Sequence, residues 1–248
     1  MNSSQHVDFV IAGTQKGGTT ALDHYLRQHP DIGMASQKEV HYFDNEAHFS
    51  QSPDYSVYHG FFDWDDGARV HGESTPVYMY WHPAPVRMQA YSASLKIILS
   101  LRNPVERAFS HWNMERGRGN DDMPFMEAIE QESTRCREAV NGQHRVFSYT
   151  DRGFYSKQIR RILDHFPLEQ LLVIRHEALR MAPESTMATV TDFLGVAPLR
   201  HLEPEDVFPT TYERQMTERE RDYLRELYRE EVNSLEALLG WDLTAWRS

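Results

Sequence analysis

Short apolar runs alternate with amphipathic stretches along this chain. The clearest run is Lys96–Leu101, whose continuous apolar residues are typical of a strand buried on both faces. Val7–Ala12 predicts another strand, with its core at Phe9–Ile11, and Leu171–Ile174 predicts a third. Arg69–Gly72 indicates a weaker strand.

Helical spacing of apolar residues appears between these runs. Thr19–His29 carries such a pattern, and Pro30 ends it. Asn103 and Pro104 form an N-cap pair that opens a further helix. Residues 44–66, rich in aromatics and Asp, indicate a long loop with one short helix. The remaining predicted helices are Pro83–Ala93, Pro124–Glu138, Tyr155–Phe166, Glu184–Leu194 and Thr217–Leu239.

Strands that alternate with helices predict the α/β class, with a central parallel β-sheet flanked by helices. A length of 248 residues allows one large domain or two small ones. Neither an internal repeat nor a Gly/Ser linker divides the sequence. We therefore predict a single domain over residues 1–248.

Composition excludes several classes of protein. Apolar runs are far shorter than the roughly 18 residues that a membrane span needs, and Met1–Asp8 lacks the basic and apolar regions of a signal peptide. The net charge of −11 disfavours a broad basic surface for nucleic acid. Cys136 is the one cysteine, which excludes an intramolecular disulfide and a Cys-rich zinc site. We expect a cytoplasmic protein with no membrane partner.

A glycine-rich segment, Gly13–Thr20, lies between the first predicted strand and the first predicted helix. Glycines let backbone N–H groups approach a phosphate, and the helix N-terminus favours its negative charge. Lysine and threonine side chains add a point charge and hydroxyl donors. The alternative is a simple turn with an exposed lysine. The expected phosphate contacts are Gln15, Lys16, Gly17, Gly18, Thr19 and Thr20.

This loop differs from the nucleotide-kinase form, in which lysine directly precedes the Ser/Thr. Here Gly18 precedes Thr19, and the lysine is earlier, at Lys16. A kinase acting on a small metabolite is therefore the second hypothesis. A catalytically silent binding module is the third.

Four further segments follow the phosphate loop in order. Arg102 lies at the end of the Lys96–Leu101 strand, where open α/β sheets bind ligands, and its planar guanidinium suits a phosphate. Ser110 in the following helix can reach the same anion; alternatively Arg102 pairs with Glu106 and Ser110 faces solvent. The four segments are Lys38–Asp44, Gly72–Tyr78, Leu101–Ser110 and Arg152–Tyr155, the last followed by a helix and Phe166-Pro167.

Together with the loop, these segments resemble the sulfotransferases that use 3′-phosphoadenosine 5′-phosphosulfate (PAPS), in particular the heparan-sulfate-type branch and its bacterial relatives. The resemblance implies the sulfotransferase fold, with a P-loop-like phosphosulfate-binding loop. It also implies PAPS as donor, 3′,5′-bisphosphoadenosine (PAP) as product and no metal.

The resemblance assigns roles to individual residues. Glu39 matches the general base of the heparan-sulfate-type enzymes and His41 the histidine beside it; histidine is the base in other branches, so His41 competes for that role. A surface pair of Lys38 with Glu39 is the structural alternative. Lys16 is expected to stabilise charge on the leaving oxygen. The resemblance places Arg102 and Ser110 at the 3′-phosphate, Tyr155 near adenine unless it is core, and Arg214, in Phe208–Gln215, over the cofactor.

Two departures bear on the acceptor. Ser74 stands where the polysaccharide enzymes commonly have a lysine, and their Cys-bracketed closing loop has no counterpart here. With the net charge of −11, this favours a small-molecule acceptor, a natural product or a sugar, sulfated on a hydroxyl or amine. The aromatic stretches Tyr42–Trp64 and Tyr78–Trp81 either line its pocket or belong to the core.

Overall fold

A computed structural model describes residues 5–199, 201–203 and 212–247. By its internal contacts the chain divides into two compact units. The first comprises Met1–Leu101 and Arg161–Val207, and the second Arg102–Arg160 and Phe208–Ser248. Each unit is described by itself.

The first unit contains a five-stranded parallel sheet in the order β2-β3-β1-β4-β5. This arrangement confirms the predicted α/β class. The short β2 was not predicted, because three residues that include a glycine carry no readable alternation. The strands are β1 (Phe9–Gly13), β2 (Ile32–Met34), β3 (Val70–Ser74), β4 (Lys96–Leu101) and β5 (Leu171–Arg175).

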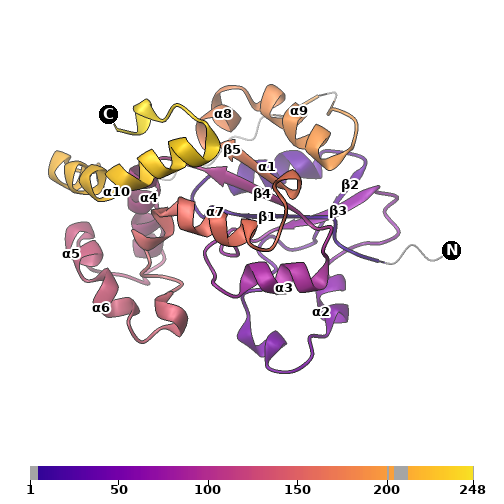
Figure 1. The fold of residues 1–248 in the computed structure, drawn as a ribbon, viewed down its shortest axis with the longest axis horizontal. Helices are drawn as coiled ribbons and strands as arrows, with labels where there is room; N and C mark the ends of the chain where they lie inside the picture. The colour runs from indigo at the N-terminus through magenta and orange to yellow at the C-terminus, as the bar shows by residue number, and fades with distance from the viewer. Residues whose placement is uncertain (1–4, 200, 204–211, 248) are drawn as a thin grey trace. The chain divides into compact units, whose positions relative to one another are not determined.

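Helices cover both faces of this sheet (Figure 1). On one face lie α1 (Thr19–Arg27), α8 (His176–Met181) and α9 (Pro183–Leu194); on the other lie α2 (Tyr55–His59) and α3 (Ala84–Tyr91). The core beneath the first group joins strand residues to helix residues. Ile97–Leu101 of β4 are all buried, which explains why its sequence is mainly apolar on both faces. The core includes Phe9, Ile11, Ile98, Leu22, Leu26, Val190 and Leu194.

Residues 44–66 form two short helical segments rather than the single one expected. These are a 3₁₀ turn, η1 (Glu46–Phe49), and α2. Each begins at an acceptor side chain: Asn45 accepts from the Ala47 amide at 3.1 Å, and Asp54 from the Ser56 amide at 2.9 Å. These local side-chain caps stabilise the start of each segment. They could not be predicted from the spacing of apolar residues.

The second unit is helical. Its long helices are α4 (Pro104–Gly117) and α10 (Glu218–Leu239), and the N-terminal part of α7 (Tyr155–Leu163) also belongs to it. Asn103 caps α4 by accepting from the Val105 amide at 3.0 Å, as predicted. Thr217 and Glu220 form a capping box at α10.

The prediction of one helix over Pro124–Glu138 was wrong. The structure has α5 (Phe125–Glu130) and α6 (Glu132–Cys136), with a bend at Gln131 between them. The buried Glu132 carboxylate accepts from the Thr150 and Asp151 amides at 2.6 and 2.8 Å. These bonds anchor the start of α6 to the Thr150–Asp151 turn. In the described part of the chain, no helix is long and apolar enough to span a membrane.

Candidate active site

The phosphate loop follows β1 and is tied to the neighbouring strand β4. The Thr14 amide donates to the Ser100 carbonyl at 3.0 Å, and the Ser100 hydroxyl donates to the Gly17 carbonyl at 2.6 Å. Inside the loop, the Gly17 amide donates to the Thr14 carbonyl at 2.8 Å. Lys16 has a φ of 68°, in the left-handed region that side-chain-bearing residues rarely adopt. The loop is therefore fixed in a conformation that costs energy, a feature that clusters at ligand sites.

Two glycines allow this conformation. A Cβ on Gly17 would overlap the Ser100 carbonyl oxygen, so only glycine fits there. Gly18 precedes α1 with a φ of 86° and has no side chain to cap the helix. The first-turn amides, including those of Thr19 and Thr20, therefore lack a side-chain cap from Gly18 and an intrahelical partner. Amides in this position favour an anion, so the loop fits a phosphate group.

His176 packs against this loop, a feature that the sequence analysis missed. A Cβ on Gly18 would lie 2.5 Å from its Nδ1 atom. His176 is the first residue of α8, directly after β5. Its position after a buried strand at the carboxyl edge of the sheet was the available signal, the same signal that singled out Arg102.

Glu39 and His41 lie at the same edge of the sheet. The Glu39 amide donates to the carbonyl of Ser74 at 3.1 Å, and Ser74 is paired with Ile11 two residues before Gly13. Glu39 and His41 have φ values of 57° and 55°. Both predicted catalytic residues thus share the left-handed backbone conformation of Lys16.

The side chains form a chain of alternating charge. His41 Nε2 lies 3.3 Å from Glu39 Oε2, and His41 Nδ1 lies 2.9 Å from the fully buried Asp44. Lys38 Nζ lies 3.2 Å from the other Glu39 oxygen. The Lys38–Glu39 pair, which was the structural alternative to a catalytic Glu39, is therefore present. Glu39 contacts His41 at the same time.

These contacts set the ionisation of both groups. Burial alone would raise the pKa of Glu39, but the hydrogen bond from His41 and the charge of Lys38 outweigh it and lower that pKa to about 2. Hydrogen bonds to Asp44 and Glu39 raise the pKa of His41 to about 9. At neutral pH Glu39 is therefore a carboxylate, and His41 is a cation with both nitrogens engaged.

Thermal stability is expected to fall as pH rises through about 9. The His41 pKa is raised from 6.5 to about 9, so its charge stabilises the fold fully below about 6.5, and this contribution disappears through 9. The measurement is the melting temperature of wild type and His41→Gln at pH 6, 8 and 10. The difference between them should shrink toward pH 10. A difference that stays constant would contradict the ion-pair geometry.

In the second unit, Arg102, one of the two predicted 3′-phosphate residues, contacts the predicted adenine residue, Tyr155. The Tyr155 hydroxyl donates to the Arg102 carbonyl at 2.9 Å, and the Tyr155 side chain is fully buried. Ser110 is buried on α4, and its hydroxyl has no hydrogen-bond partner among the described residues. A buried donor of this kind fits an anion. Glu106 is paired with Arg221 at 2.6 Å.

Arg214 is engaged within the second unit. Its guanidinium contacts both oxygens of Glu220, at 2.5 and 2.8 Å, and lies 5.3 Å from the rings of Phe109 and Trp112. Contact with a cofactor would compete with this ion pair, so the Arg214 assignment stays a prediction. Residues 208–211 of the expected closing segment lie outside the described residues.

The aromatic stretches are mostly core. Tyr42, Phe43, Tyr58, Tyr78 and Trp81 are all at most 5% exposed. They pack on one another, with Tyr42 and Phe43 each within 5.0 Å of the Tyr58 ring centroid. Their number in the sequence therefore reflects packing rather than an open acceptor surface.

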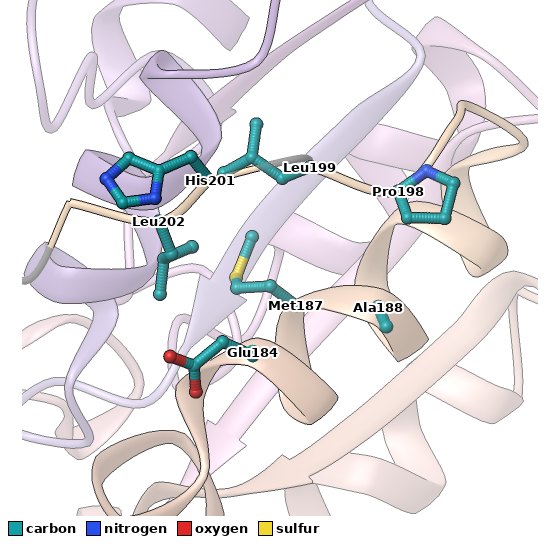
Figure 2. A pocket seen from close by; sticks show the side chains of 7 residues that line it. All are labelled: Glu184, Met187, Ala188, Pro198, Leu199, His201 and Leu202. Atoms are coloured by element: carbon teal, nitrogen blue, oxygen red, sulfur yellow. The ribbon is translucent and has the colours of Figure 1, made fainter.

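A pocket of about 190 Å³ lies elsewhere in the first unit, between α9 and residues 198, 199, 201 and 202 (Figure 2). Met187 and Leu202 point into it, with Glu184 and His201 nearby. It contains no residue of the phosphate loop or of the Glu39–His41 pair. Among the described residues, no group of three or more His, Cys, Asp or Glu side chains is arranged to hold a metal.

A parallel sheet with a strand–glycine-rich loop–helix unit, and a carboxylate at its carboxyl edge, is a type of site that suits an anionic ligand. The family model described as "Sulfotransferase domain" matches residues 6–235. The chain belongs to this sulfotransferase family.

Individual relatives agree with this assignment. The chain is 32% identical over 194 residues to heparan sulfate glucosamine 3-O-sulfotransferase 3B1 of Mus musculus, covering 78% of this chain and 47% of that protein. It thus spans about half the length of the curated relatives it matches. A solved sulfotransferase from Alicyclobacillus acidocaldarius is 30% identical with a TM-score of 0.86, covering 98% of this chain and all of the other. The sulfotransferase domain of the curacin pathway, at 16% identity and TM-score 0.58, shares the fold.

Proposed function

We propose that this enzyme transfers a sulfonate group from PAPS to a hydroxyl or amine of a small-molecule acceptor. The observation that carries the proposal is that the phosphate loop and Glu39 lie at the carboxyl ends of two adjacent strands of one sheet, β1 and β3. Glu39 is bonded to the end of β3, which pairs with β1, and β1 leads into the loop. An anion-binding loop beside an ionised carboxylate suits in-line transfer from an anionic donor to a protonated nucleophile.

In this proposal Glu39 is the general base. His41 carries a proton at neutral pH and has both nitrogens bonded to carboxylates, which leaves no lone pair for the acceptor. Glu39 is ionised, and a weakly basic carboxylate suffices because the acceptor oxygen becomes strongly acidic as it bonds to sulfur. The proton passes to a Glu39 oxygen while His41 holds the carboxylate in place.

Lys16 supplies the complementary charge. PAPS provides the sulfonate and leaves as PAP, so negative charge develops on the oxygen that bridged phosphorus and sulfur. The Lys16 ammonium and the first-turn amides of α1 would stabilise that charge without moving, which makes them effective in the transition state. No metal is needed for this step, because the chain itself provides the cation.

Arg102 and Ser110 are proposed to bind the 3′-phosphate. We expect PAP to bind far more tightly than AMP, and Arg102→Ala to lower PAP affinity by about ten- to a hundred-fold, since a charged hydrogen bond contributes roughly 1.5–3 kcal/mol. Calorimetry with both nucleotides measures this, and Arg137→Ala, an exposed arginine of the same unit, is the matched control. Equal affinity for PAP and AMP would remove the 3′-phosphate assignment.

The acceptor class follows from charge. The relatives named for heparan sulfate act on a polyanion, whereas this chain carries a net charge of −11 and has Ser74 where those enzymes commonly have lysine. We therefore place a natural product or a sugar ahead of a sulfated polysaccharide. The proposed setting is the cytoplasm, where the single buried Cys136 stays reduced. Because the family model covers parts of both units, we propose that residues 1–248 work as one domain.

A donor and acceptor screen tests the proposal. The enzyme is incubated with PAPS and a panel of hydroxyl and amine acceptors in EDTA, and products are read by mass spectrometry for one added sulfonate. A parallel arm uses ATP with magnesium. Sulfonated product in EDTA supports the proposal, whereas phosphorylated product that needs ATP and magnesium would overturn it in favour of the kinase.

A further inference from the structure

The segment that carries Glu39 and His41 is held by a buried network beneath it. His41, Tyr42 and Phe43 are not part of any strand, so their amides need other partners. The Tyr42 amide donates to the Tyr78 hydroxyl at 2.9 Å, and the Phe43 amide to the same oxygen at 3.3 Å. The His41 amide donates to the Thr75 hydroxyl at 3.4 Å.

Both hydroxyls lie beside one carboxyl group. The Thr75 hydroxyl donates to Glu73 Oε2 at 2.5 Å. Burial raises the pKa of Glu73 to about 7, and the Thr75 and Tyr78 hydroxyls oppose this rise. A hydroxyl that gives its proton to Glu73 turns its lone pairs toward the amides above it. Glu73 is itself fully buried at the end of β3 and cannot exchange these partners for water.

We propose that Glu73 is a positioning residue of the transfer site: through Thr75 and Tyr78 it fixes the backbone that presents Glu39 and His41. The fixed backbone is the one in which both residues adopt positive φ, a conformation that must be held by its surroundings. This inference rests on the proposed function of Glu39 and identifies the residue that holds the Glu39 backbone in place.

Two buried tyrosines provide a matched comparison. Tyr58 and Tyr78 are each fully buried beside Glu73: the Tyr58 hydroxyl donates to Glu73 Oε1 at 3.3 Å, and Tyr78 interacts electrostatically with the same carboxyl group. The Tyr78 hydroxyl also accepts hydrogen bonds from the amides of residues 42 and 43, whereas among the described residues the Tyr58 hydroxyl is hydrogen-bonded to Glu73. Tyr58→Phe therefore removes only a contact with Glu73. Tyr78→Phe also removes the oxygen that accepts hydrogen bonds from the amides of residues 42 and 43.

The first readout is independent of the acceptor. The His41 imidazole is titrated by NMR in ¹⁵N-histidine-labelled full-length protein, with the signal assigned by His41→Gln. Asp44, Glu39 and Lys38 are the charged groups around it. In Tyr78→Phe and in Thr75→Val the pKa of His41 is expected to move from about 9 toward 6.5, and in Tyr58→Phe it should remain as in wild type. Thr75→Ser, which keeps the hydroxyl, should restore the wild-type value.

The second readout is turnover with an acceptor from the screen. Tyr78→Phe should lower kcat by about ten-fold or more with PAP affinity within two-fold, because a misplaced catalytic group costs rate rather than donor binding. The inference would be overturned if the pKa of His41 were unchanged in both Tyr78→Phe and Thr75→Val, or if it changed equally in Tyr58→Phe. If Tyr78→Phe fails to fold, Thr75→Val and Thr75→Ser decide. Full activity of a Glu39→Gln enzyme would contradict the assignment of Glu39 as the general base. The NMR comparison would still test whether Glu73 positions the segment that carries Glu39 and His41.

Discussion

Replacing Glu39 by glutamine is expected to lower turnover by about 10²-fold or more while PAP affinity stays nearly unchanged. The amide keeps the shape of the carboxylate, and the proposed cofactor contacts lie in other segments. What disappears is the group that takes the acceptor's proton, and a general base typically contributes roughly 10²–10⁴-fold. Steady-state kinetics with a hydroxyl acceptor measure turnover, and calorimetry with PAP measures binding.

The control and the competing variant separate the base from its neighbours. Glu46→Gln changes an exposed carboxylate of the same stretch, which pairs with Arg87, and should leave turnover unchanged. His41→Ala should cost less than Glu39→Gln, because His41 orients the base and does not accept the proton. A near-normal Glu39→Gln enzyme beside an inactive His41→Ala enzyme would move the base to His41. A hydroxyl acceptor is required, since an amine that is already neutral would blunt both effects.

Apolar periodicity predicted the parts of the fold that depend on burial. The strand Lys96–Leu101 was predicted to the residue, because both of its faces are covered and four of its six residues are aliphatic. The cap at Asn103 was also predicted, since its bond to the Val105 amide is local in sequence. The strand-to-helix transition at Gly13–Thr20 was predicted for the same reason, because glycine content and strand–helix context are both local signals.

What could not be predicted depends on contacts between distant segments. Asp44 lies inside a recognised motif, but its bond to His41 requires both positive-φ residues, which no spacing rule indicates. His176 lies beside Gly18 only because the start of α8 meets the phosphate loop in the fold, although the two residues are 158 positions apart. Glu73 could be aligned with the family, yet its link to residues 41–43 passes through two hydroxyls. Tertiary hydrogen bonds of this kind leave no periodic trace in a sequence.

Gly17→Ala is expected to damage both stability and donor binding. The added Cβ would overlap the Ser100 carbonyl oxygen and lie 2.8 Å from the Thr14 methyl carbon, so rigid backbone of β4 or the loop must shift. Overpacking of this kind costs roughly 1–3 kcal/mol, which for a chain of this size lowers the melting temperature by roughly 2–12 °C. The shift also misaligns the amides around the phosphate, and PAP affinity should fall by about ten-fold or more.

Gly117→Ala is the matched control for this substitution. Gly117 ends α4, an added Cβ there meets nothing within 4 Å, and alanine favours a helix by up to roughly 1 kcal/mol over glycine. The melting temperature should therefore stay level or rise, with PAP affinity unchanged. Differential scanning fluorimetry and calorimetry on the two variants make the comparison. If Gly17→Ala melts and binds PAP like Gly117→Ala, the loop is not the close-fitting phosphate cradle that its contacts with Ser100 indicate.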